Sequence, residues 1–160
     1  MIMDMGMIYA LTGAALAVFL CGAGSSIGIG YAGREANGVL SEEPDKFGIM
    51  LLLVALPGTQ GIYGFLTGFL VLMKIGILGG AATVTITNFQ GLQILIATLP
   101  IAVSGFFSAI HQGKVCAAGI SVASKHPEAS MRALVYGALV ETYAVLALVI
   151  SIFLLFSVKI

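Results

Sequence analysis

The chain has 160 residues, of which 59% are hydrophobic and only 9% are charged, and its formal net charge is zero. About a quarter of the residues in ordinary soluble domains are charged, so this composition indicates an integral membrane protein. Seven basic residues scattered along the chain form no patch for nucleic acid. A chain of this length has no room for a soluble catalytic domain beside its spans. We therefore expect a single membrane domain over residues 1–160.

Four apolar segments, each long enough for one transmembrane helix, are separated by ionisable residues. They cover about residues 5–33, 47–73, 88–123 and 133–158. A helical span needs about 20 apolar residues, and these continuous runs lack the alternation of barrel strands. The sequence thus predicts an all-α membrane protein with four transmembrane helices. The amino terminus lacks the basic region of a cleavable signal, so we expect the first span to be retained.

The first span contains the glycine-rich run CGAGSSIGIGYAG at residues 21–33. Glycines two and four residues apart leave a nearly smooth helix face that neighbouring helices can approach closely. No strand precedes these glycines, which argues against a dinucleotide-binding loop. The third span has a similar but sparser set at Gly105, Gly113, Ala117 and Ala118. Cys21 and Cys116 lie in these two spans, and we expect both to be free, buried residues rather than a disulfide or a metal site.

Two charged connections, residues 34–46 and 124–132, resemble each other and reveal an internal repeat. A shift of about 83 residues aligns the first group with the second: Gly22, Ser25, Ile27, Gly30, Val39, Ser41 and Pro44 with Gly105, Ser108, Ile110, Gly113, Val122, Ser124 and Pro127. The chain therefore reads as two fused helical hairpins, residues 1–80 and 81–160. Most Lys and Arg residues flank the two charged connections, so we expect both connections on the cytoplasmic side and both termini outside.

The second span contains polar groups around the sequence LPGTQGIYG, residues 56–64. Thr59, Gln60 and Tyr63 lie within one helical turn. Pro57 cannot donate a backbone hydrogen bond, and the glycines beside it leave carbonyls such as that of Leu56 accessible. This stretch therefore offers a carbonyl, a hydroxyl and an amide oxygen.

Glu141 is the only Asp, Glu, Lys or Arg deep inside an apolar segment, near the middle of the fourth span. An intramembrane carboxylate must stay protonated or hold a cation, and it marks an ion pathway, a proton relay or a counter-ion. The oxygens of the second span lie at a matching depth, and Gln112 adds an amide from the third. A proton needs fewer ligands, whereas a hard cation such as Na⁺ suits this set. Tyr63 could orient the carboxylate.

Other interpretations of these polar residues remain open on the sequence alone. Glu141 could be a neutral acid that joins two helices, or it could pair directly with Lys114, although Lys114 is closer to the charged connection. Gln112 could make a simple interhelical hydrogen bond. We assign no role to His111, because a lone histidine near a helix end is usually structural.

Three segments carry a resemblance to a known family. They are LPGTQGIYGF (residues 56–65), FFSAIHQGKVCAAGI (residues 106–120) and LVETYAVL (residues 139–146). In these segments and over essentially the whole chain, the sequence resembles the duplicated proteolipid, the c or K subunit of the membrane rotor of V-type ATPases. The similarity is greatest to the bacterial sodium-transporting kind, which also implies a cell-membrane location in a bacterium.

The resemblance implies a four-helix subunit that assembles with identical copies into a closed rotor ring, with the first and third helices inside. It places the essential carboxylate on Glu141 and the carboxylate-orienting tyrosine on Tyr63. The implied Na⁺ ligands are Leu56 (through its carbonyl), Thr59, Gln60, Gln112 and Glu141. None of these positions departs from the sodium pattern; proton-driven relatives lack the full oxygen set.

The implied mechanism is rotary, and the chain itself is expected not to be an enzyme. ATP hydrolysis in other subunits turns the central stalk and the ring, and each site passes a stator subunit that carries a basic residue. The alternative coupling ion is H⁺. Two rivals from other classes are a small four-helix exporter that binds its substrate at Glu141 and a purely structural assembly protein.

Overall fold

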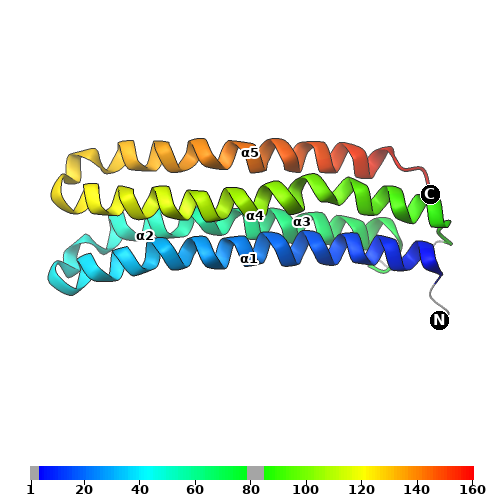
Figure 1. Cartoon of the computed structure of the whole chain (residues 1–160), viewed down its shortest axis with the longest axis horizontal. Helices are drawn as coiled ribbons and strands as arrows, with labels where there is room; N and C mark the ends of the chain where they lie inside the picture. The colour runs from blue at the N-terminus through cyan, green and yellow to red at the C-terminus, as the bar shows by residue number, and fades with distance from the viewer. Residues whose placement is uncertain (1–3, 79–84) are drawn as a thin grey trace.

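The computed structural model describes residues 4–78 and 85–160, and within them the chain forms four long transmembrane-type helices in two hairpins (Figure 1). The first and third are the single helices α1 (Met5–Glu42) and α4 (Asn88–Lys125). The second consists of α2 (Phe47–Ala55), the 3-10 turn η2 (Leu56–Gly58) and α3 (Thr59–Lys74). The fourth is α5 (Ser130–Ser157). The all-α fold with two hairpins is confirmed for these residues.

Both hairpins turn at one end of the bundle, and both termini lie at the other (Figure 1). Short 3-10 turns, η1 (Pro44–Lys46) and η3 (Pro127–Ala129), make the two connections. The residues before the prolines have nearly the same backbone angles, φ −133° and ψ 76° at Glu43 and φ −135° and ψ 79° at His126. A proline pushes the preceding residue out of the helical region, so each long helix ends at the same point of the repeat. Between the second and third helices, residues 79–84 lie outside the described residues.

The helices extend further than the apolar segments predicted. The connection expected over residues 34–46 is helical as far as Glu42, and most of the connection expected over residues 124–132 is helical too. Arg, Glu, Ala and Leu are strong helix formers, and Ala36 is still buried against the neighbouring helices. Charge therefore marks where the apolar band ends, whereas proline marks where the helix ends. A helix of 38 residues is about 57 Å long, so α1 and α4 exceed a bilayer core of about 30 Å.

Glycines bring α1 and α4 into backbone contact along much of their length. A Cβ atom built on Gly24 would lie 2.6 Å from the Phe106 carbonyl oxygen, and one on Gly28 would clash with the Ala109 carbonyl oxygen. Gly113 is equally crowded by the backbone of Gly28. Without a hydrophobic driving force between helices in lipid, such close packing is a main source of helix association. The predicted close neighbour of the glycine-rich helix is therefore α4 of the same chain.

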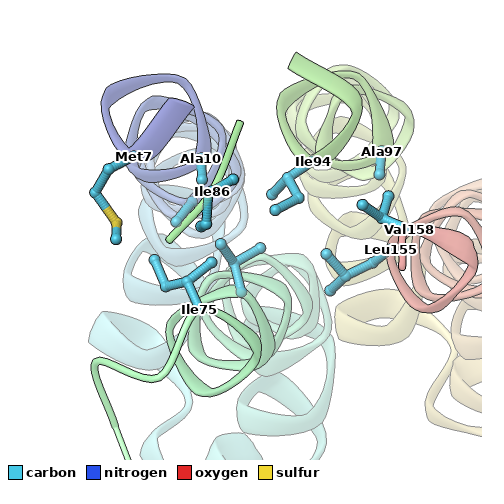
Figure 2. Close-up of a cluster of buried hydrophobic side chains, with 10 residues drawn as sticks. Met7, Ala10, Ile75, Ile86, Ile94, Ala97, Leu155 and Val158 are labelled. Carbon is cyan, nitrogen blue, oxygen red and sulfur yellow. The ribbon is translucent and has the colours of Figure 1, made fainter. Parts of the chain in front are cut away.

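Buried aliphatic side chains close the bundle at the end where the termini lie. Figure 2 shows side chains from the helices and from the segments next to their ends meeting there: Met7, Ala10, Ile75, Ile86, Ile94, Ala97, Leu155 and Val158. A capping box at the start of α4 fixes the same region, since Thr87 and Gln90 exchange side-chain and backbone hydrogen bonds. At the other end, Lys46 Nζ donates to the Ser124 carbonyl at 2.5 Å and pairs with Glu43 at 2.7 Å.

Both cysteines are free and buried, as the sequence predicts. The Cys21 thiol donates to the Ile101 carbonyl at 3.3 Å, and Cys116 belongs to the apolar cluster near the hairpin turns. They serve as small apolar side chains between the helices.

Candidate ion-binding site

The second helix tightens where Pro57 interrupts its hydrogen bonds, at the 3-10 turn η2. The Leu56 carbonyl oxygen there accepts from the backbone N–H of Thr59 and from its hydroxyl, the latter at 2.9 Å. Across the interface, Ser25 Oγ on α1 accepts from the Gly61 N–H at 2.8 Å. The turn therefore places the Leu56 carbonyl and the Thr59 hydroxyl side by side at the start of α3.

Glu141 on α5 is held by side chains from two other helices. The Tyr63 hydroxyl on α3 donates to Glu141 Oε1 at 2.5 Å, and Gln112 Nε2 on α4 donates to Glu141 Oε2 at 3.3 Å. Gln112 Nε2 also donates to the Gly137 carbonyl at 3.0 Å, which ties α4 to α5 one turn before the carboxylate. Both carboxyl oxygens thus accept a hydrogen bond from a neutral donor, an arrangement that fixes the orientation of the group.

The two glutamine amides complete a chain of hydrogen bonds across the bundle. Gln60 Nε2 donates to Gln112 Oε1 at 2.7 Å and to Ser108 Oγ at 3.2 Å. Gln60 Oε1 lies 3.3 Å from the Thr59 hydroxyl. Both glutamines are fully buried, with 0% of their surface exposed. A buried amide lowers the stability of the fold unless it is hydrogen-bonded, so the hydrogen bonds of this network are needed to keep both glutamines in the protein interior.

The site lies beside the outer surface of the bundle. Glu141 and Tyr63 are half-buried. An open depression on α5, lined by Ala138, Glu141, Thr142, Val145 and Leu146, leads to the carboxylate from that surface. Glu141 is therefore accessible from the side of the bundle that α5 forms.

All six residues predicted for the site, Leu56, Thr59, Gln60, Tyr63, Gln112 and Glu141, come together in this one network. Their roles as ion ligands stay predictions. Sequence reasoning missed Ser108 and the carbonyls of Gly137 and Val140, which fix the helices around the amides. A signal for Ser108 was present, because it aligns with Ser25 in the repeat, and each of these serines joins the first long helix of its hairpin to the second.

The rival interpretation of a Lys114–Glu141 ion pair does not match the geometry. Lys114 is exposed on α4, with its Nζ atom 5.6 Å above the ring of Tyr31 on α1. His111 is also exposed and lines an open groove with Ser104, Ser108 and Tyr143, and among the described residues its side chain makes no hydrogen bond to the amide network. Gln112 does make interhelical hydrogen bonds, but one of them goes to the carboxylate itself.

Two stretches of the chain, residues 12–71 and 95–154, match the model of the ATP synthase C subunit family. The chain belongs to this family. The two matches are offset by the same shift that aligns Gly22 with Gly105, so this proteolipid is a duplicated member with one copy in each hairpin. Such c/K subunits are non-catalytic membrane components of the rotor in V/A-type ATPases. The exporter and the structural assembly protein are thereby excluded.

Two relatives show how far the similarity extends. The proteolipid is 43% identical over 152 residues to the V-type sodium ATPase subunit K of Enterococcus hirae, covering 95% of this chain and 93% of that protein. It is 36% identical over 152 residues to the A-type ATP synthase subunit K of Methanocaldococcus jannaschii, covering 95% of this chain and 64% of that protein. The four helices of this chain therefore correspond to nearly the whole of the sodium ATPase subunit.

Proposed function

We propose that this proteolipid carries Na⁺ across the membrane, one ion at each Glu141, as the rotor of a V-type ATPase turns. The observation that supports this most strongly is the oxygen set beside the carboxylate: the Leu56 carbonyl, the Thr59 hydroxyl and the Gln60 and Gln112 amide oxygens, which one hydrogen-bond network links to Glu141. A proton would need the carboxylate and one partner, whereas Na⁺ prefers several neutral oxygens around one negative charge.

The hydrogen bonds to Glu141 argue in the same direction. Tyr63 and Gln112 both donate to the carboxyl group and so hold it in one orientation, and a carboxylate at this depth needs a cation to balance its charge in the membrane. The relative from Enterococcus hirae is named as a sodium ATPase subunit, which agrees with this choice of ion. A proton-driven rotor is the alternative that the test below separates.

Identical subunits would close into a ring with α1 and α4 inside and α3 and α5 outside. Large apolar side chains stand exposed on two separate sides of the subunit. One groove between α1 and α3 is lined by Phe19, Phe65 and Phe69, and another lies between α4 and α5. Two unlike apolar grooves on one subunit suit head-to-tail contacts between neighbours, the arrangement that generates a ring.

The ring would work by electrostatics as it rotates. A site that holds Na⁺ is neutral and can face lipid, whereas an empty carboxylate must stay near a positive charge. A stator subunit with a basic residue would supply that charge, so the ion leaves into one half-channel there and a new ion enters from the other. Central-stalk subunits on the cytoplasmic side would drive the ring, since this chain is not the ATP-hydrolysing part.

The hairpin turns would face the cytoplasm in the cell membrane, with both termini outside. Arg34, Lys46, Lys125 and Arg132 lie at the turn end, and Lys74 and Lys159 at the other. A cysteine placed at the exposed Glu43 in a cysteine-free protein should react with an impermeant thiol reagent only from the cytoplasmic side. Reaction in intact cells from outside would reverse this orientation.

The proposed function is tested by carbodiimide labelling of Glu141. Carbodiimides react with a protonated carboxyl group, so bound Na⁺ should protect the residue, and lower pH should weaken the protection as protons compete. Thr59→Ala should raise the Na⁺ concentration needed for protection, because one ligand is lost while the acid remains. Wild-type labelling that does not respond to Na⁺ near neutral pH would instead favour a proton-driven rotor.

A further inference from the structure

One buried hydroxyl of the network belongs to none of the predicted ligands. Ser108 lies on α4, one turn before Gln112, and only 7% of its surface is exposed. Its Oγ atom is 3.0 Å from the Val140 carbonyl oxygen on α5 and 3.2 Å from Gln60 Nε2 on α3. Ser108 therefore contacts the other two helices that build the site.

The direction of these hydrogen bonds follows from counting protons. A serine hydroxyl has one proton, and Ser108 donates it to the Val140 carbonyl. Its oxygen can then only accept, and it accepts from Gln60 Nε2. The second amide proton of Gln60 goes to Gln112 Oε1 at 2.7 Å.

The orientation of the Gln60 amide is thereby fixed. Both of its N–H groups point to α4, so its oxygen Oε1 lies 3.3 Å from the Thr59 hydroxyl, which shares its single proton between Oε1 and the Leu56 carbonyl. If the amide rotated by half a turn, its oxygen would face two oxygens: Gln112 Oε1 and the oxygen of a Ser108 hydroxyl whose proton is already used. Buried acceptors that face each other in this way are strongly disfavoured.

We infer that Ser108 is a positioning residue of the ion site: it holds the Gln60 amide so that its oxygen, and not its nitrogen, faces the cation. This inference rests on the proposed function and extends it to a residue that would not touch the ion. It predicts an effect on Na⁺ and none on H⁺, because a proton on Glu141 does not use the Gln60 oxygen.

The test is Na⁺ protection of Glu141 against carbodiimide in the intact complex. Ser108→Ala should raise the Na⁺ concentration for half protection by roughly three- to tenfold, the effect of one buried hydrogen bond. The pH dependence of labelling without Na⁺ should stay as in the wild type. Ser108→Thr keeps the hydroxyl and should restore the Na⁺ response.

Ser104→Ala is the matched control. Ser104 lies one turn earlier on the same helix, and its hydroxyl also donates to a carbonyl of α5, that of Tyr143 at 3.1 Å, but it lies outside the amide network. Ser104→Ala should change neither the Na⁺ concentration for half protection nor the pH dependence of labelling. An unchanged Na⁺ requirement in Ser108→Ala would overturn the inference while wild-type protection upholds the proposed function. The inference would also be wrong if both serine variants raised the Na⁺ concentration for half protection equally, or if Ser108→Ala also changed the pH dependence of labelling. Either result would show that Ser108 only holds the helices together.

Discussion

Side chains from three helices form the surroundings of Glu141, near the middle of the fourth span. α5 supplies the carboxylate, α3 the Tyr63 hydroxyl and α4 the Gln112 amide. The hydroxyl makes the shorter of the two contacts, 2.5 Å against 3.3 Å, and it comes from a side chain that is not itself a proposed ligand. In the proposed site, different side chains would therefore orient the carboxylate and coordinate the ion, so a single substitution should remove either contribution alone.

Tyr63→Phe should disturb the orientation of the Glu141 carboxylate without removing any proposed ion ligand. The ring stays, but Glu141 loses a charge-assisted hydrogen bond worth about 1 to 2 kcal/mol in this half-exposed position. The Na⁺ concentration for half protection in the labelling assay should rise by roughly five- to thirtyfold. Tyr143→Phe is the control, because Tyr143 is exposed two residues after Glu141 on the same helix. Equal Na⁺ requirements in Tyr63→Phe and the wild type would show that the contact does not support binding.

At the scale of single elements, the glycines of α1 divide into two sets. Gly24 and Gly28 contact α4 of the same chain, whereas a Cβ atom on Gly22 or Gly30 would meet nothing within 4 Å. The first set is needed to form the subunit. The second leaves an open, smooth strip on a membrane helix, which suits a close approach by a neighbouring subunit in the proposed ring.

Two leucine substitutions on α1 should therefore have different effects: one should prevent folding of the subunit, and the other should prevent assembly of the oligomer. Gly28→Leu would drive a side chain into the Ala109 carbonyl and Pro57, so the subunit itself should be destabilised by more than about 3 kcal/mol and lose protease resistance in detergent. Gly22→Leu should give a folded subunit that no longer forms the large oligomer. The division would be wrong if Gly22→Leu still assembled like the wild type, or if Gly28→Leu folded normally.

The sequence was most informative where polar residues are rare. In a chain with 9% charged residues, Glu141 and the LPGTQG segment stand out, and equal depth in paired helices was enough to bring Gln60, Gln112 and Tyr63 together. The helix ends were less predictable, since Arg34 and Glu35 close the apolar band but favour the helix that carries them. The repeat pointed to Ser108 as a contact between helices, but its proposed effect on the ion site was not predictable, because that effect depends on which way the Gln60 amide faces.

At the scale of the whole molecule, duplication has produced two hairpins that differ at one decisive position. The turns at Pro44 and Pro127 and the serines Ser25 and Ser108 are shared, but Gln60 stands about where the second hairpin has Glu141. The first hairpin has thus become a partner that supplies neutral oxygens to the acid of the second. The four helices therefore contain one carboxyl group at this depth, and the proposed ring would move one ion for each pair of hairpins.

The central claim, that this charge is balanced by Na⁺, is tested most directly by transport. The intact ATPase is placed in ion-tight liposomes, and uptake of radioactive sodium is measured on addition of ATP, with and without a protonophore. Direct Na⁺ transport predicts uptake that persists with the protonophore and rises, because proton flow then relieves the opposing membrane potential. Glu141→Gln should abolish it, since an amide cannot balance the ion's charge. Acidification of the vesicles without sodium uptake, abolished by the protonophore, would contradict the account.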